Sequence, residues 1–345
     1  MVSPQRVLVI GAAGLIGNAL VRAWERRGAE VLGCDRVCRP GGPFVTLDFT
    51  HEGQVASLLR EFRPGIVAVP AARPHVDYCE AHPEETRLAN VLAPALVSRL
   101  CYQTGSVMVF YSSDYVFDGS KPSYGEDDPV CPVNEYGRQK VEAEEAVLAC
   151  GRHLVIRSSG VYGWQWVPKN FVLQVLTALR ESRALRVPHD IRYNPTSAEN
   201  LAEVTAELCG HGAAGIFHVV GRDRLARSEF AQEVARVFGL DAGLIEPVEV
   251  ESLMGTPVPS GNGGRALRPA PGDPKRPSGV TPGTAGSGVL PAAPRPKESS
   301  LRTDKVRALS RAPLWGAAQG LQDMVRQKTA WEEYCRTSLP TAGAI

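Results

Sequence analysis

The 345-residue chain lacks both a long apolar run and a sizeable net charge. No stretch approaches the roughly 20 apolar residues that a membrane-spanning helix needs. A formal net charge of +1 gives no overall field that would attract nucleic acid or an anionic membrane. The start of the chain, residues 3–6 (SPQR), is polar and does not have the pattern of a signal peptide. We therefore expect a cytoplasmic protein with neither a nucleic acid nor a membrane as its partner.

The chain also lacks paired cysteines. It contains eight, but none forms a CxxC motif, and the closest pair is Cys34 and Cys38. No second pair of cysteine or histidine follows at the spacing of a zinc site. We interpret the cysteines as reduced thiols that pack as small hydrophobic residues, and we predict no metal site.

What the sequence does contain is an alternation of short apolar strands and amphipathic helices. Strands are predicted at residues 6–10, 30–34, 66–69, 106–111 and 154–157. Helices are predicted at residues 15–27, 55–62, 84–104 and 135–150. This spacing implies parallel βαβ units with right-handed crossovers. The predicted fold class is α/β, with a Rossmann-type, doubly wound parallel sheet.

The second half of the chain predicts a smaller α/β lobe over the carboxyl edge of that sheet. Helices are expected at residues 170–183, 198–208 and 229–238, with a strand at 215–220. Residues 255–294 contain nine glycines, nine prolines and no aromatic residue, a composition that favours disorder. We therefore divide the chain into a dinucleotide-binding domain (1–165), a substrate-binding lobe (166–254 with 295–330) and a disordered insertion (255–294).

Three glycines separate the first predicted strand from the first predicted helix. Gly11 permits a tight strand-to-helix turn, Gly14 lets backbone N–H groups approach a phosphate, and Gly17 lets the helix pack closely on the strand. A GxxGxxG pattern alone is weak, but here it follows a strand and opens a helix. We assign a pyrophosphate-binding loop to the residues Gly11, Ala13, Gly14, Leu15, Ile16 and Gly17.

The choice between NAD and NADP depends on the residues after the second strand. Asp35 ends that strand, where an acidic residue usually binds the ribose hydroxyls of NAD. Its neighbour Arg36 either accommodates the 2′-phosphate of NADP or is a solvated surface charge. Asp48, followed by Phe49, is either an acceptor near the adenine or a turn-capping residue. The cofactor is therefore predicted as NADP or NAD.

A second group of residues has the chemistry of a ketone reductase. Tyr136 and Lys140 are four residues apart on a predicted helix, so both face one side. A tyrosine serves as proton donor if its pKa is lowered, and an adjacent ammonium group lowers it. Ser112 and Ser113 end the fourth predicted strand, at the carboxyl edge where such sites form.

Two longer stretches carry a resemblance to a known family. Residues 111–119 (YSSDYVFDG) and 134–140 (NEYGRQK) resemble the extended short-chain dehydrogenase/reductase family. Within it they resemble the branch of the dTDP-4-dehydrorhamnose reductases and the related regulatory β subunit of methionine adenosyltransferase. The resemblance covers about residues 5–254 and 292–325. It implies that Ser113, Tyr136 and Lys140 are the catalytic residues.

The resemblance also implies further site residues. Those expected to contact the cofactor, besides the phosphate loop and the Asp35 region, are Ala71, Ala72, Arg73, Asn90, Tyr136 and Lys140. Those expected to contact the substrate are Ser112, Asp114, Tyr115, Tyr162 and Asn170. Asn90 is expected to position the lysine through water, or else is a polar residue inside a helix. His75 is either a substrate-side acid or a surface histidine.

Three functions follow as expectations. The first is an NAD(P)H-dependent reductase of a 4-keto-6-deoxy nucleotide sugar, with a second copy of the chain in a homodimer as an expected partner. The second is a non-catalytic, dinucleotide-binding regulatory subunit with a synthetase as its partner. The third is a nucleotide-sugar epimerase or dehydratase, which is disfavoured because Asp114-Tyr115 stands where dehydratases more often have an Asp-Glu pair.

Overall fold

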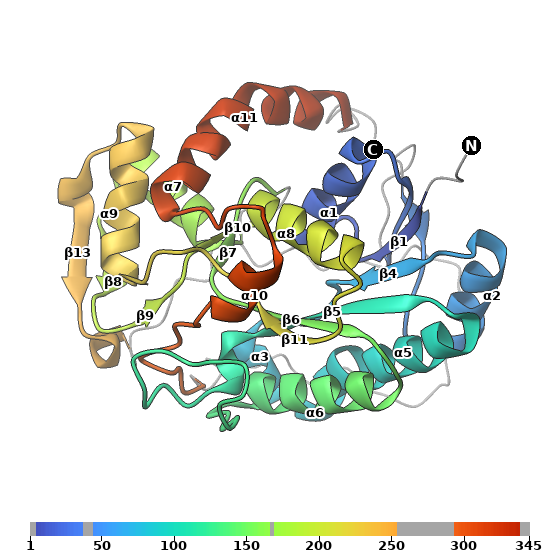
Figure 1. The fold of residues 1–345 in the computed structure, drawn as a ribbon. Helices are drawn as coiled ribbons and strands as arrows, with labels where there is room; N and C mark the ends of the chain where they lie inside the picture. Colours follow the sequence, from blue (N-terminus) through green and yellow to red (C-terminus); the bar gives the residue numbers. More distant parts are fainter. Residues whose placement is uncertain (1–4, 37–43, 166–168, 254–292, 339–345) are drawn as a thin grey trace, which may run out of the picture.

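A seven-stranded parallel sheet forms the centre of the protein in this computed structural model, which describes residues 5–36, 44–165, 169–253 and 293–338. The strand order is β11-β6-β5-β4-β1-β2-β3 (Figure 1). The strands are β1 (Arg6–Ile10), β2 (Glu30–Asp35), β3 (Val45–Thr46), β4 (Ile66–Val69), β5 (Val107–Ser113), β6 (Leu154–Ser158) and β11 (Gly215–His218). The order reverses between β1 and β4, which is where open α/β sheets bind ligands at their carboxyl edge.

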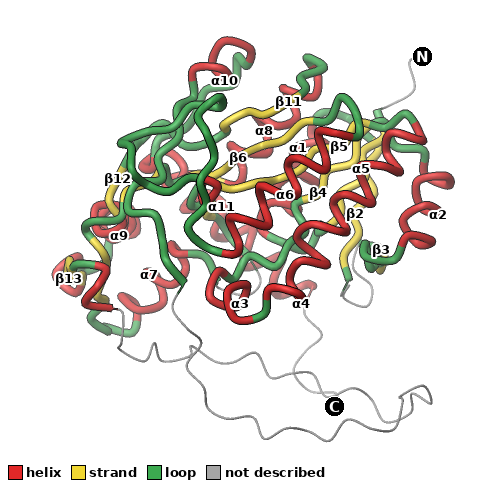
Figure 2. The backbone as a smooth tube through the Cα atoms, turned by 90° about the horizontal axis from the view of Figure 1, so that it is seen from below, coloured by secondary structure: helices red, strands yellow, loops and turns green. Residues whose placement is uncertain are grey.

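Helices cover both faces of the sheet, so its central strands are buried on both sides. One face packs against α1 (Leu15–Arg26) and α8 (Ala198–Gly210). The other packs against α2 (Glu52–Phe62), α5 (Ala93–Thr104) and α6 (Glu135–Ala149) (Figure 2). A sheet buried on both faces requires continuous apolar strands, which explains why runs such as VLVI and IVAV appear without polar alternation. The doubly wound α/β fold predicted from the sequence is confirmed.

The segment at residues 215–220 lies elsewhere than predicted. We assigned it to the smaller lobe, but β11 pairs in parallel with β6 and forms the edge of the central sheet. The preceding helix α8 packs along α1, so β6, α8 and β11 form one more βαβ unit. The long insertion of lobe residues between β6 and α8 hides this unit in the sequence.

The predicted helix at 84–104 is divided into three parts. It consists of α4 (Pro83–Arg87), a π-helical turn η1 (Leu88–Leu92) and α5, and the short α3 (Val76–Ala81) precedes it. A 3₁₀ turn, η2 (Asp114–Val116), follows β5 directly. The π turn matters for the site because it carries Asn90, which is fully buried.

The smaller lobe has its own apolar core beside the carboxyl edge of the sheet. Its helices are α7 (Phe171–Arg180), α9 (Arg227–Phe238) and α11 (Ala317–Ser338). Three short strand pairs connect them: β8 (Leu185–Pro188) with β13 (Ile245–Val248), β9 (Arg192–Tyr193) with β12 (Leu225–Ala226), and β10 (Thr196–Ser197) with β7 (Val161–Tyr162). The remaining short elements are η3 (Ala242–Leu244), η4 (Val250–Leu253) and α10 (Asp304–Leu309).

The end of the predicted insertion belongs to the folded protein. Residues 255–292 lie outside the described residues, but Ala293 is buried and donates its N–H to Asp77 at 2.9 Å. Arg295 then forms a bidentate ion pair with the same carboxylate, at 2.5 and 2.8 Å. The chain thus returns to α3, beside the end of β5. Among the described residues, no helix is long and apolar enough to cross a membrane.

Candidate dinucleotide and catalytic site

The glycine loop between β1 and α1 has the close packing that its sequence predicts. Gly11 has a φ of +96°, which L-residues rarely adopt, and a Cβ there would lie 2.9 Å from the Ala71 nitrogen. A Cβ on Gly17 would overlap the Gly11 carbonyl oxygen. Gly14 is the N-cap of α1 and has extended backbone angles. Gly11 and Gly17 are therefore required for the turn itself, whereas Gly14 leaves room beside it.

The loop has the features of an anion site. The amide groups of Leu15, Ile16 and Gly17 form the first turn of α1, and no acceptor among the described residues takes a hydrogen bond from them. They lie at the positive end of the helix dipole, and glycines leave their approach open. This cradle, which a side chain at Gly14 would narrow, fits the pyrophosphate of a dinucleotide.

Asp35 lies at the end of β2 beside this loop. Its carboxylate accepts hydrogen bonds from the N–H of Ala13 at 3.2 Å and of Arg36 at 2.8 Å. The carboxylate is thereby fixed next to the phosphate loop, as the sequence pattern predicts. The Arg36 side chain is exposed, so the choice between a ribose hydroxyl and a 2′-phosphate stays open.

Asp48 has the turn-capping role that the sequence left as an alternative. Its Oδ1 accepts hydrogen bonds from the backbone N–H of Thr50 at 3.1 Å and from its hydroxyl at 2.7 Å. Burial raises the pKa of Asp48, but these hydrogen bonds outweigh it, so the net pKa is lowered. Phe49 packs against the core formed by α2 and α5. The structure therefore gives both residues structural contacts.

Asn90 fixes the segment that follows β4. Its Oδ1 accepts the Arg73 N–H at 2.7 Å, and its Nδ2 donates to the Arg73 carbonyl at 3.2 Å. Ala71 is held against the glycine loop by its N–H bond to the Ile10 carbonyl at 3.2 Å, and Ala72 lies between these two anchors. Asn90 thus holds the predicted cofactor-lining segment through its backbone. Its expected role in positioning Lys140 through water stays a prediction.

Gln139, which was not predicted from the sequence, connects Asn90 to α6. It accepts a hydrogen bond from Asn90 Nδ2 at 2.8 Å and donates to Pro83 O and Thr86 Oγ1 at 3.0 Å. Gln139 is buried on α6, directly before Lys140. A glutamine inside a helix carries no recognisable signal, because its partners come from segments about 50 residues earlier. His75, in contrast, is exposed and caps α3 by accepting the Tyr78 N–H at 3.1 Å.

Lys140 lies on α6, as predicted, and its side chain extends to β5. It is 2% exposed, its Nζ donates to the Tyr111 carbonyl at 2.7 Å, and it lies 5.7 Å from the centre of the Tyr136 ring. Burial lowers the pKa of Lys140 to about 8. The ammonium form therefore predominates at neutral pH and is lost just above it.

The pKa of Tyr136 shifts in the direction opposite to the sequence prediction. Burial raises the pKa of Tyr136, and the charges of Asp114, Cys79 and Tyr115 raise it further. A hydrogen bond with Ser113 acts in the opposite direction. We expected the neighbouring lysine to lower it, but desolvation dominates in this half-buried position. The phenol is consequently protonated at neutral pH, which is the form that can donate a proton.

Ser113 and Asp114 form a buried pair beneath Tyr136. The Ser113 hydroxyl donates to Asp114 Oδ1 at 2.9 Å, and the Ser159 hydroxyl donates to Asp114 Oδ2 at 2.7 Å. Asp114 is 4% exposed, and burial raises its pKa although hydrogen bonds from Ser299, Ser159 and Ser113 oppose the shift. We expected Asp114 to contact substrate, but its carboxylate is occupied in orienting Ser113.

The other predicted substrate residues have different positions. Tyr115 lies beside the site, with its ring 6.3 Å from that of Tyr136. Ser112 is buried, and its hydroxyl has no hydrogen-bond partner among the described residues. Tyr162 packs in the core of the smaller lobe and donates to the Ala317 carbonyl at 3.2 Å. Asn170 caps α7 by accepting the Leu173 N–H at 3.3 Å. The side chains of Tyr162 and Asn170 therefore have contacts that support the lobe.

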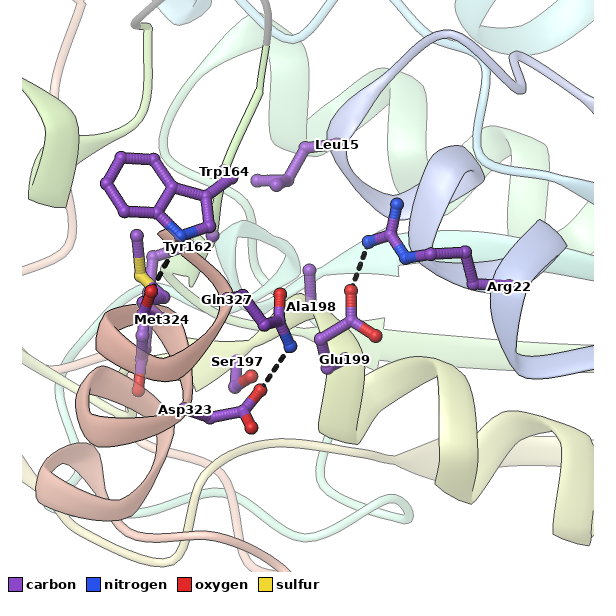
Figure 3. Close-up of a pocket in the computed structure, with 11 residues that line it drawn as sticks. Leu15, Arg22, Tyr162, Trp164, Ser197, Ala198, Glu199, Asp323, Met324 and Gln327 are labelled. Carbon is purple, nitrogen blue, oxygen red and sulfur yellow. Dashed lines mark hydrogen bonds and ion pairs between the residues drawn. The ribbon is translucent and has the colours of Figure 1, made fainter. Parts of the chain in front are cut away.

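A narrow crevice lies where the smaller lobe meets α1 and α8 (Figure 3). Leu15 and Arg22 line one side, and Trp164 lines the opposite side with α11. Arg22 forms an ion pair with Glu199, and the Trp164 indole donates to the Met324 carbonyl at 2.8 Å. None of the three predicted catalytic residues lines this crevice. Its side chains mainly bind one another, so we interpret it as the junction between the lobe and the sheet.

The fold, the glycine loop and the serine, tyrosine and lysine at the end of β5 define a Rossmann-type protein of the short-chain dehydrogenase/reductase class. Within that class the chain belongs to the RmlD substrate-binding domain family, which it matches over residues 5–259. The family predicted from the sequence is therefore confirmed.

Two relatives show the range of this family. The chain is 34% identical over 245 residues to a "probable low-salt glycan biosynthesis reductase" of Haloferax volcanii, an alignment that covers 69% of this chain and 82% of the relative. It is 30% identical over 266 residues to the methionine adenosyltransferase 2 subunit beta of Xenopus laevis, covering 75% and 79%. The two relatives include both an enzyme and a subunit of another enzyme.

Solved structures share the fold over nearly the whole chain. A dTDP-4-dehydrorhamnose reductase of Bacillus anthracis in complex with NADP has a TM-score of 0.77 at 23% identity, covering 94% of this chain and 100% of that one. A dTDP-4-dehydrorhamnose reductase orthologue of Clostridium acetobutylicum has a TM-score of 0.76 at 25% identity, with the same coverage.

Proposed function

We propose that the protein is an NAD(P)H-dependent reductase that acts on the ketone of a 4-keto-6-deoxy nucleotide sugar. The observation that carries this proposal is that Ser113 at the carboxyl end of β5 and Tyr136 and Lys140 on α6 come together at the edge of the sheet that also holds the glycine loop, where the amides of residues 15–17 have no acceptor among the described residues. The relatives named as reductases and the structure crystallised with NADP support it.

Tyr136, Ser113 and Lys140 each have a separate role in the proposed reaction. When bound, the nicotinamide supplies the hydride that reduces the ketone carbon. Tyr136, which is protonated at neutral pH, donates its phenolic proton to the ketone oxygen. The Ser113 hydroxyl is fixed by its hydrogen bond to Asp114. It also forms a hydrogen bond with the Tyr136 phenol and holds that phenol in place. The Lys140 ammonium stabilises the phenolate that remains and binds the ribose of the cofactor.

The proposal is tested with purified protein, NADPH or NADH, and a dTDP-linked 4-keto-6-deoxyhexose. We expect cofactor oxidation that depends on the keto sugar. Tyr136→Phe should lower kcat by about 10²–10⁴-fold, the usual contribution of a positioned general acid, while leaving the cofactor Kd within about twofold. A wild-type protein that binds the cofactor and the sugar nucleotide but never oxidises the cofactor would overturn the proposal.

The similarity to the methionine adenosyltransferase subunit favours one other candidate, a dinucleotide-binding regulatory subunit. That function needs the phosphate loop but no proton transfer. It predicts that the protein co-purifies with a synthetase and that Tyr136→Phe leaves the association unchanged. Full activity of the isolated chain toward a keto sugar would exclude it as the main function.

A further inference from the structure

Three serine hydroxyl groups converge on the carboxylate of Asp114, directly behind the proposed catalytic residues. Ser113 and Ser159 donate to it at 2.9 and 2.7 Å, and Ser299 is a third donor. Among the described residues, no lysine, arginine or histidine lies within ion-pair distance of this carboxylate, which is 4% exposed. Its charge is therefore stabilised by the three hydroxyl groups and its own amide, so the loss of one hydroxyl matters more than it would beside a cation.

Ser299 comes from the segment 293–301, which runs between the smaller lobe and the catalytic end of the sheet. On the lobe side, its N–H donates to the Arg192 carbonyl of β9 at 3.0 Å. On the other side, the Pro294 carbonyl of the same segment accepts a hydrogen bond at 2.9 Å from Asn134, the N-cap of α6. Ser299 is 2% exposed, so water does not compete for its hydroxyl. The backbone of this segment thus fixes Ser299 relative to both the lobe and the catalytic helix.

The hydrogen bonds of Ser113 show how Asp114 acts on Tyr136. A serine hydroxyl has one proton and two lone pairs. Ser113 gives its proton to Asp114, and its oxygen accepts the Tyr115 N–H at 3.2 Å. The remaining lone pair accepts the phenolic hydrogen of Tyr136, with which Ser113 forms a hydrogen bond. The direction of this chain of hydrogen bonds therefore depends on the carboxylate of Asp114 being held in place.

We propose that Ser299 is a positioning residue for ketone reduction and acts on the catalytic tyrosine through Asp114. The proposal rests on the function proposed above and adds a residue from the segment that joins the lobe to the sheet. Without the Ser299 hydroxyl the carboxylate loses one of its donors, and its orientation toward Ser113 is less well fixed. The phenol then leaves the position from which it donates to the ketone oxygen, and a misplacement of about 1 Å lowers a rate by roughly 10²-fold.

Two neighbouring serines provide a matched pair of variants. Ser300 is also 2% exposed, but its hydroxyl donates to the Glu298 carboxylate instead of Asp114. Ser299→Ala should lower kcat for NADPH-dependent reduction of a dTDP-linked 4-keto-6-deoxyhexose about tenfold, with both KM values within about twofold of the wild type. Ser300→Ala should keep kcat within about twofold. Each variant removes one buried hydroxyl, so a loss of stability alone would affect both alike.

A double-mutant comparison tests the route of the effect. In a Ser113→Ala protein Asp114 has no hydroxyl to orient, so adding Ser299→Ala should change kcat by less than about twofold. A tenfold loss in both backgrounds would show that Ser299 acts by another route and would overturn the proposal. Equal kcat values in Ser299→Ala and Ser300→Ala would overturn it as well.

A further readout needs no turnover. The hydrogen bond from Ser299 lowers the pKa of Asp114, so Ser299→Ala should raise that pKa and Ser300→Ala should leave it unchanged. A ¹³C NMR titration of the aspartate carboxyl groups measures the pKa, with Asp114→Asn identifying the signal. An unchanged pKa in Ser299→Ala overturns the inference whether or not the protein is a reductase. A wild type that binds NADPH but never oxidises it with the keto sugar refutes the reductase proposal instead, and the titration still decides whether Ser299 controls Asp114.

Urea denaturation identifies a variant that does not fold. If Ser299→Ala is unfolded, Ser299→Cys takes its place, because it keeps the approximate size of the side chain but is a weaker donor. It should lower kcat and raise the pKa of Asp114 in the same directions, and a wild-type value of both would overturn the proposal.

Discussion

The two ends of the proposed cofactor site are built from different parts of the chain. The phosphate end consists of backbone groups from one short loop, residues 11–17, and its shape depends on glycine. The catalytic end consists of side chains from β5, η2 and α6, supported by Asn90 on the π turn. The first end needs only local geometry to bind an anion, whereas the second needs several distant segments at fixed distances.

This difference predicts that glycine substitutions affect cofactor binding most strongly. Gly17→Ala places a methyl group against the Gly11 carbonyl, so β1 and α1 must separate. We expect cofactor binding to be lost and the free energy of unfolding to fall by about 1–3 kcal/mol, the usual cost of overpacking. Isothermal titration of NADP⁺ and chemical denaturation measure both.

Gly14→Ala is the companion variant that separates binding from folding. Its φ of −75° suits any residue, and its only close contact would be the Gly11 oxygen at 3.2 Å. It should fold as the wild type does and bind NADP⁺ about tenfold more weakly. Normal cofactor affinity in both glycine variants would show that the loop does not hold the phosphates.

At the catalytic end, the pH profile should report Lys140. Because burial lowers the pKa of Lys140 to about 8, the ammonium form is lost as the pH rises through 8. We expect kcat/KM for keto-sugar reduction to be constant below about pH 7 and to fall about tenfold for each unit above 8. The profile is measured from initial rates of NADPH oxidation in a series of buffers. A rate that rises between pH 8 and 10 would contradict the role given to the ammonium group.

A smaller effect, on stability alone, is expected from substituting Asn90, which connects the segment after β4 to α6. Asn90→Ala removes the hydrogen bonds to the Arg73 backbone and to Gln139 in a fully buried position. The free energy of unfolding should fall by about 1–3 kcal/mol because those groups lose their partners. Gln103→Ala, at an exposed position on α5, is the control and should have little effect on urea denaturation. Equal free energies of unfolding in the two variants would contradict the role given to Asn90 in holding the Arg73 segment against α6.

The sequence predicted most of what is local in this protein. The main strands of the first 165 residues, the turn at the glycine loop and the helices α1, α2 and α6 follow from apolar runs and turn residues, whereas the predicted helix at 84–104 is divided by the π turn. The catalytic set Ser113, Tyr136 and Lys140 was predicted from the shared helix face of its last two members and from the family resemblance, and its role stays a prediction. The edge strand β11 was misplaced because the lobe residues 159–197 separate its partner β6 from the helix α8 that precedes it.

What could not be predicted depends on contacts between distant segments. Gln139 resembles any glutamine on a helix until α6 is placed against Asn90 and Thr86. The resemblance implied that Asp114 contacts the substrate, but the hydroxyl of Ser159, directly after β6, donates a hydrogen bond to its carboxylate. The direction of the Tyr136 shift was wrong because burial cannot be read from a four-residue spacing.

We infer that cofactor binding and proton transfer reside in separate parts of the site. The most direct test measures the NADPH Kd and the kcat for keto-sugar reduction in Gly14→Ala and Tyr136→Phe under the same conditions. We predict that Gly14→Ala raises Kd about tenfold with kcat nearly unchanged, and that Tyr136→Phe lowers kcat by about 10²–10⁴-fold with Kd unchanged. A Tyr136→Phe protein that retains the wild-type kcat would contradict the account.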